Sequence, residues 1–83
     1  MYEIIVTEQA KSQLARLDSF SRERIGAALE RIKIRPQDFV KKMYNSKYYQ
    51  ARVDNFRIIL DIKDIQLILY VVEIGSRDRI YKS

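Results

Sequence analysis

Two stretches of alternating apolar and polar residues flank Asp54 and Asn55, and they constrain this chain more than any other feature of its sequence. Such a dipeptide between alternating stretches predicts a β-hairpin with a two-residue turn. The turn pairs apolar residues across the strands: Val53 with Phe56, Ala51 with Ile58, and Tyr49 with Leu60. One face of the hairpin is therefore wholly apolar and needs a covering layer, whereas the other face is polar.

The same register places Arg52 directly opposite Arg57 on the polar face, which Gln50 shares. Like charges that face each other across a strand pair repel by roughly 0.2–1 kcal/mol. Two solvated surface arginines are one interpretation of this pair. The other is an anion site, because two planar guanidinium forks match a phosphate, or the charge that develops during phosphoryl transfer.

The segment before the hairpin predicts a strand followed by two helices. Residues 2–6 are rich in β-forming residues, and Thr7 is placed to cap a first helix. Apolar residues then recur at helical spacing in two groups: Ala10, Leu14 and Leu17, followed by Ile25, Leu29 and Ile32. We expect Ser21 to cap the second helix and Pro36 to end it within two residues upstream, so that the two helices run antiparallel.

Residues 36–47 lack clean periodicity and are predicted to form an irregular connection. Three strands are expected at 48–53, 56–62 and 67–74, in an antiparallel meander. The last is apolar on both faces, which is typical of a central strand or of one that a partner covers. The fold class is therefore α+β.

In this predicted fold, two antiparallel N-terminal helices pack on one face of a small, mainly antiparallel four-stranded sheet. The element order is strand-helix-helix-strand-strand-strand, and residues 1–83 are expected to form one domain. The pattern leaves open where the first strand joins the sheet.

Composition excludes several kinds of chemistry. The chain has no cysteine and no histidine, which removes disulfides, thiolate nucleophiles, imidazole bases and almost every transition-metal site, so we expect no cofactor. Its longest apolar run, residues 67–72, is far shorter than the roughly 20 residues of a membrane helix. The amino terminus lacks the basic start and cleavage site of a signal peptide. These features predict a cytoplasmic protein without a membrane partner.

The positive charge is concentrated in one part of the chain. The net charge is +5, and residues 31–57 carry eight basic and two acidic residues, which leaves the remainder about neutral. This distribution favours an acidic partner such as nucleic acid or an acidic protein. The residues predicted to contact RNA or phosphate are Lys41, Lys42, Lys47, Gln50 and Arg79. Lys41 and Lys42 suit solubility equally well.

A nuclease built from these residues would need an unusual design. RNA cleavage without a metal uses the 2′-hydroxyl as an internal nucleophile, and arginines can stabilise the charge on the phosphorus. Tyr81 can transfer a proton only if nearby cations lower its pKa from about 10. Arg77 and Arg79 are close to it in sequence. Tyr81 as a hydrophobic plug and residues 77–79 as a solvated charge run are the simpler alternatives.

Two stretches, YQARVDNFRII at residues 49–59 and VEIGSRDRIY at residues 72–81, occur in the order found in the RelE/ParE toxin superfamily. Together with the strand-helix-helix opening, they resemble that superfamily over nearly the whole chain. The resemblance implies a small α/β toxin that an antitoxin holds inactive. In the RelE branch it further implies a ribosome-dependent endoribonuclease that cuts mRNA in the decoding site.

The resemblance also implies roles for individual residues. By motif position, the catalytic set of the RelE branch falls on Arg52, Arg57, Arg77 and Tyr81. Gln50 stands where well-characterised RelE enzymes carry a lysine, and Ser76 where many relatives carry histidine or lysine. If that lysine is the usual proton acceptor, this chain is either a slower catalyst or uses another base, with Tyr81 the candidate.

The implied partners are a small, acidic, helical antitoxin, the ribosome with its mRNA, and operator DNA only through the antitoxin complex. Two other functions stay open. The ParE branch shares the fold and the hairpin but poisons DNA gyrase and lacks the nuclease set; Arg77 and Tyr81 favour RelE over it. A basic nucleic-acid-binding module without turnover would also account for the charge.

Overall fold

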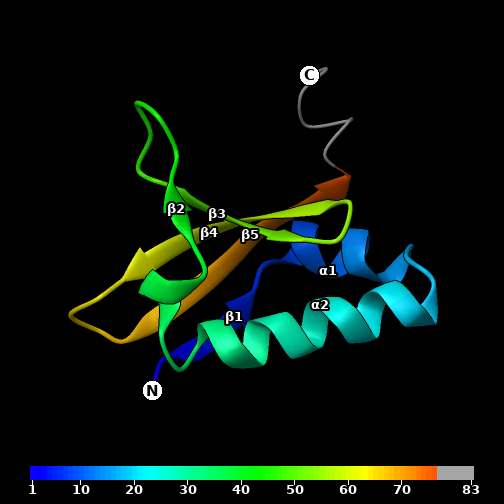
Figure 1. Ribbon diagram of the computed structural model, residues 1–83, viewed down its shortest axis with the longest axis horizontal. Coiled ribbons are helices and arrows are strands. Elements are labelled where there is room, and N and C mark those ends of the chain that lie inside the picture. The colour runs from blue at the N-terminus through cyan, green and yellow to red at the C-terminus, as the bar shows by residue number, and fades with distance from the viewer. Residues whose placement is uncertain (77–83) are drawn as a thin grey trace.

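A five-stranded sheet, covered on one face by two helices, makes up the computed structural model, which describes residues 1–76 (Figure 1). Its elements in chain order are β1 (Glu3–Val6), α1 (Glu8–Ala15), α2 (Ser19–Ile32), the 3₁₀ helix η1 (Pro36–Asp38), β2 (Lys41–Lys42), β3 (Tyr49–Val53), β4 (Phe56–Lys63) and β5 (Ile68–Ser76). The α+β class with two helices on one side of the sheet is confirmed. No helix within residues 1–76 is long and apolar enough to span a membrane.

The predicted hairpin forms in the predicted register. In β3 and β4, Val53 pairs with Phe56 and Arg52 pairs with Arg57 across the turn. Asp54, the first turn residue, has φ 53°, a left-handed conformation that aspartate tolerates better than most residues. Alternation then directs Ala51, Ile58 and Leu60 toward the helices, and all three are buried. The hairpin therefore supplies the centre of the core.

The sheet has one strand more than the four that were predicted. Its order is β1-β5-β4-β3-β2, and the fifth strand is the two-residue β2, in which Lys41 pairs with Gln50 and Lys42 with Tyr49. The sequence pattern missed it because two residues are too few to show alternation. The rest of the predicted irregular connection is held by the η1 turn, by buried Pro36 and by Val40, which packs against the core.

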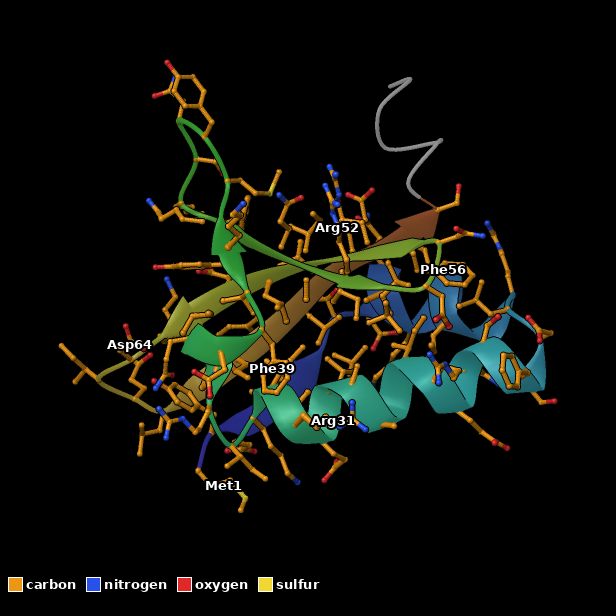
Figure 2. The ribbon with its side chains drawn as sticks, viewed as in Figure 1. Met1, Arg31, Phe39, Arg52, Phe56 and Asp64 are labelled. Carbon is orange, nitrogen blue, oxygen red and sulfur yellow. The ribbon has the colours of Figure 1, made fainter. Side chains whose placement is uncertain are left out.

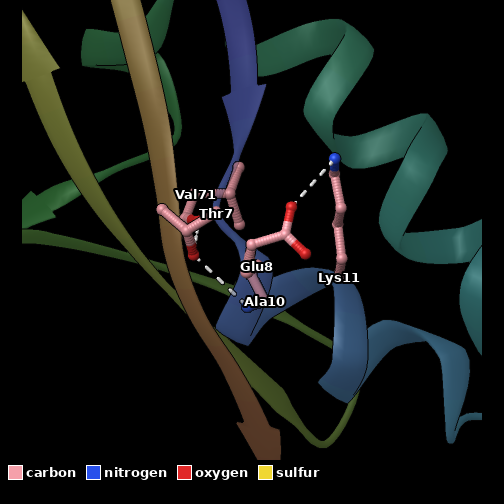
Figure 3. A network of polar contacts seen from close by, with 5 residues as sticks. All are labelled: Thr7, Glu8, Ala10, Lys11 and Val71. Atoms are coloured by element: carbon pink, nitrogen blue, oxygen red, sulfur yellow. Dashed lines mark hydrogen bonds and ion pairs between the residues drawn. The ribbon is translucent and has the colours of Figure 1, made fainter.

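Strand β5 lies between β1 and β4, which explains its apolar faces. It pairs antiparallel with β4 and parallel with β1, and this settles the position of the first strand. Because β1 ends at Val6, the edge of β5 beyond that point needs other partners. The Thr7 hydroxyl donates to the Val71 carbonyl at 2.9 Å (Figure 3), and the Ile74 amide donates to Gln13 Oε1 of α1 at 2.7 Å.

The caps of the helices differ in part from the sequence expectation. Thr7 caps α1 as predicted, since its Oγ1 accepts from the Ala10 amide at 3.3 Å. For α2, the prediction of Ser21 was wrong: Asp18 is the N-cap, and its Oδ2 accepts from the Ser21 amide at 3.3 Å. This hydrogen bond lowers the pKa of the Asp18 carboxyl. An aspartate three residues upstream outcompetes the serine because it starts the helix one turn earlier.

The end of α2 also lies earlier than predicted. The helix stops at Ile32 with Lys33 as its C-cap, although the Arg35 amide still donates to the Arg31 carbonyl at 3.3 Å. Pro36 instead begins the η1 turn, where its missing N–H is no loss. The buried face of α2 is the predicted one: Ile25, Leu29 and Ile32.

Candidate functional site

Arg52 and Arg57 lie side by side on the face of the sheet that the helices leave open. In Figure 2 the Arg52 side chain points away from α2. The two arginines differ in burial: Arg52 is exposed, whereas Arg57 is only 5% exposed, so the interpretation as two solvated surface arginines does not hold for Arg57. β4, which carries Arg57, is the central strand of the sheet, and β3, which carries Arg52, lies next to the edge strand β2. Arg57 therefore carries its charge in a buried position, whereas the charge of Arg52 is accessible to solvent.

A hollow of about 420 Å³ opens beside Arg52 at the β2 edge of the sheet. Its lining consists of Asp38, Phe39, Val40, Lys41, Gln50 and Arg52. Within the part of the chain that the structure describes, the buried Oε1 of Gln50 accepts no hydrogen bond. A buried acceptor left without a donor costs stability, so Gln50 offers a hydrogen-bonding position next to the arginines.

Of the three lysines of β2 and the following loop, Lys41 lines this hollow, whereas Lys42 pairs with Tyr49 across the strands. Lys41, Lys42 and Lys47 are exposed, and in residues 1–76 none of them takes part in an ion pair. Lys42 Nζ lies 6.0 Å from the centre of the Tyr49 ring, and Lys47 Nζ lies 5.3 Å from that of Tyr48. Their charges remain available to a phosphate chain.

Between α2 and β3 lies a second hollow, of about 230 Å³, on the helix side of the sheet. It has an apolar floor that includes Ala28, Ile32 and Ala51, and Arg31 and Arg52 contribute to its rim. At one end Arg24 binds Asp54 of the hairpin turn through two hydrogen bonds, of 3.0 Å and 2.8 Å. An apolar floor with a charged rim is the composition of a protein-docking site.

Not all predicted site residues can be placed. Arg77, Arg79 and Tyr81 lie outside the described residues. Of the other predicted site residues, the structure brings together Arg52, Arg57, Gln50 and Lys41. Within residues 1–76, no three Cys, His, Asp or Glu side chains form a group that could hold a metal.

The sequence reasoning missed Arg24, Arg31 and Tyr44. Arg24 and Arg31 lie on α2 and line the hollow beside β3, and nothing in their local sequence indicates that they border this strand. Tyr44 is 98% exposed, and its signal was available: a tyrosine among lysines in a segment without helical or strand periodicity.

Comparison with known proteins identifies the family. The model of the family described as "ParE toxin of type II toxin-antitoxin system, parDE" matches residues 4–81. The chain belongs to this family. The superfamily resemblance of its hairpin and closing motif is thereby confirmed, and the protein is a toxin of the RelE/ParE type. No curated protein matches the toxin significantly.

Solved RelE structures share the fold of the toxin. The RelE chain of the intact E. coli RelBE toxin-antitoxin complex superposes with a TM-score of 0.80 at 18% identity, over 92% of this chain and 96% of that one. The archaeal RelE-RelB complex from Pyrococcus horikoshii OT3 superposes with a TM-score of 0.80 at 19% identity, over 94% of this chain and 97% of that one. The isolated E. coli RelE toxin superposes with a TM-score of 0.75 at 19% identity, over 99% of this chain and 93% of that one.

Proposed function

We propose that this toxin is a RelE-like endoribonuclease that cuts mRNA on the ribosome. The observation that carries the proposal is the opposition of Arg52 and Arg57 on the open face, next to a hollow lined by Gln50 and Lys41. A buried and an exposed guanidinium together form a preorganised anion site, because the buried one is already held in place. The likeness to RelE structures supports this interpretation at the level of the fold.

In the proposed reaction the 2′-oxygen of the RNA attacks the adjacent phosphorus. A bond forms between them, the bond from phosphorus to the 5′-oxygen breaks, and a 2′,3′-cyclic phosphate results. Arg52, Arg57 and Arg77 neutralise the charge on the pentacoordinate phosphorus. The 2′-hydroxyl loses its proton to solvent water, and the leaving 5′-oxygen takes up a proton; Tyr81 relays one of these protons or orients the RNA. The reaction as proposed uses no cofactor.

Gln50 makes the proposed enzyme a weak one without further help. A neutral amide can hold the 2′-hydroxyl by a hydrogen bond but cannot accept its proton at neutral pH. Alignment of the RNA must therefore supply much of the rate, as the ribosome does when it holds the codon in a fixed conformation. Lys41, Lys42, Lys47 and Arg79 bind phosphates of the RNA.

The proposed partners follow from the same picture. Two of the solved structures that share this fold are RelE complexes with the antitoxin RelB, so we expect a small, acidic, helical antitoxin for this toxin. The hollow between α2 and β3 fits an apolar side chain of such a partner, flanked by carboxylates that meet Arg31 and Arg52. Operator DNA would be bound only through the antitoxin complex. The toxin would act in the cytoplasm, where it meets ribosomes.

A gyrase poison is the second candidate. The matching family model is that of ParE toxins, and Gln50 replaces the lysine typical of RelE enzymes. Such a toxin would cause DNA damage and leave mRNA intact.

The deciding experiment is to induce the toxin without its antitoxin and to map mRNA 5′ ends on translated and untranslated copies of one message. Cuts in phase with codons, only in the translated copy, are expected. Growth arrest with intact mRNA would favour the gyrase poison. Neither arrest nor cutting would favour a basic nucleic-acid-binding module.

A further inference from the structure

The loop between β2 and β3 is ordered and holds an aromatic side chain in solvent. The Met43 amide donates to the Tyr48 carbonyl at 2.9 Å, and the Tyr48 amide donates to Ser46 Oγ at 3.0 Å. Asn45 supplies the left-handed residue of the turn, with φ 55°. Tyr44 is 98% exposed on this loop, which projects beyond the sheet in Figure 1. The hydrogen-bonded turn therefore presents the Tyr44 ring to solvent, where a ligand can reach it.

The surroundings of this ring are basic. No acidic residue occurs between Phe39 and Val53, whereas Lys41, Lys42, Lys47 and Arg52 do, and none of these four forms an ion pair in residues 1–76. Cations without an ion-pair partner beside an exposed aromatic ring are typical of single-strand nucleic-acid binding, in which a base stacks on the ring and phosphates contact the lysines.

An acidic protein is a poorer fit to this loop. Protein interfaces need an apolar centre that excludes water. The other two exposed side chains of this loop, those of Asn45 and Lys47, are polar. The hollow between α2 and β3 has such an apolar floor, so the toxin offers a better protein site elsewhere. The loop itself offers a ring and charges.

The position of the loop relative to the arginines fits one continuous strand of RNA. From Arg52, strand β3 runs back through Gln50 to Tyr49, a distance of about 10 Å at the usual rise per residue, and the loop adjoins this end of the strand. Lys41 lies beside this path because it pairs with Gln50. A phosphate held at Arg52 and Arg57 therefore leaves a few nucleotides of the same strand to reach the loop.

We propose that Tyr44 is a base-stacking site for single-stranded RNA, with Lys47 and the lysines of β2 on the adjoining phosphates. This site rests on the proposed function for the path of the strand, but it binds RNA without cleavage and without the ribosome. It positions the RNA on the open face and takes any base, because every base has a stacking surface.

The test is binding of a dye-labelled 12-nucleotide single-stranded RNA to the purified full chain, measured by fluorescence anisotropy. The companion ligand is a ribose-phosphate strand of equal length without bases. Tyr44→Ala is expected to weaken RNA binding about 5- to 150-fold. Tyr44→Phe should bind like the wild type. Ile65→Ala, which truncates a 99% exposed apolar side chain at another loop, is the matched control and should have no effect.

Each outcome decides the proposal. The wild type should prefer RNA over the strand without bases, and Tyr44→Ala should lose that preference. Equal binding of both strands by the wild type, an unchanged affinity of Tyr44→Ala, or no RNA binding at all would overturn the stacking site. An equal effect of Tyr44→Ala on binding of a glutamate-rich peptide would assign the loop to acidic protein instead. Base-dependent binding combined with uncut mRNA in cells would overturn the nuclease and leave the stacking site standing.

Discussion

Arg24 of helix α2 grips Asp54 of the hairpin turn with two parallel hydrogen bonds, from Nε to Oδ2 at 3.0 Å and from Nη2 to Oδ1 at 2.8 Å. These hydrogen bonds connect α2 to the β3–β4 turn, which sets the register that places Arg52 opposite Arg57. The Arg24 hydrogen bonds, reinforced by its charge, lower the pKa of the Asp54 carboxyl despite some desolvation. Both side chains are partly exposed, so the pair serves geometry more than stability.

The lowered pKa of Asp54 predicts a pH-dependent contribution to stability. A carboxyl whose pKa is lower in the folded state stabilises that state above its unfolded pKa, about 3.9, and the stabilisation disappears as pH falls through the folded pKa. Asp54→Asn, which retains the left-handed turn, should be less stable than the wild type at pH 7 and nearly equal at pH 2. Urea unfolding at several pH values measures this difference.

Glu23→Gln is the matched control for that experiment, since Glu23 is exposed on the same helix and forms no ion pair with residues 1–76. Its difference from the wild type should stay flat with pH. A difference for Asp54→Asn that is the same at pH 2 and pH 7 would contradict the role of the ion pair.

Thr7 lies where β1, α1 and β5 meet, and its hydroxyl should contribute more to the free energy of unfolding than that of an ordinary surface threonine. It caps α1 and also donates toward the Val71 carbonyl. Thr7→Val keeps the shape but removes the hydroxyl, and should lower the free energy of unfolding by about 1–2 kcal/mol. Thr7→Ser should restore most of the loss. Ser12→Ala in the exposed part of α1 is the control, and an equal stability of Thr7→Val and the wild type would contradict the cap.

Strand pairing in this toxin was predictable where alternation and turn chemistry agree. Asp54 and Asn55 fixed the register of β3 against β4 because a two-residue turn allows only one pairing of the apolar residues. Thr7 was predictable as a cap because it directly precedes the first residues that recur at helical spacing. Both features depend on residues close to one another in the chain.

What could not be predicted depends on the order of strands in space. The burial of Arg57 on the central strand β4 depends on residues far from it in the chain, and the Arg24–Asp54 pair follows from α2 lying against β3. The two-residue strand β2 exists because the β3 edge is there to pair with, and no local pattern reveals it. The same limit applies to the candidate site, where sequence named the arginines but not their unequal exposure.

The unequal burial of the two arginines predicts that their loss has different consequences. Arg52→Ala should lower the cleavage rate on translated mRNA by roughly 100-fold or more and leave stability within about 0.5 kcal/mol. Arg57→Ala should lower cleavage similarly and, because it empties a buried position, also cost about 1–3 kcal/mol of stability. Toe-printing of a ribosome-bound message and thermal unfolding measure the two effects.

Arg16→Ala removes an exposed arginine remote from the open face and should change neither quantity. Full cleavage by both Arg52→Ala and Arg57→Ala, with folding intact, would contradict the anion site.

Gln50→Lys tests whether the missing base limits the toxin. Gln50 lies on β3 between the arginines and Lys41, with a buried Oε1 that accepts no hydrogen bond from residues 1–76. A lysine there stands among Arg52 and Lys41, and neighbouring positive charges lower its pKa toward neutrality, as a proton acceptor requires. Cleavage of translated mRNA should rise by up to about 100-fold, the low end for general-base catalysis. Gln50→Met, which matches the length without the amine, should not raise it. A gyrase poison would gain no mRNA cleavage from either substitution, so this pair of variants also separates the two candidate functions.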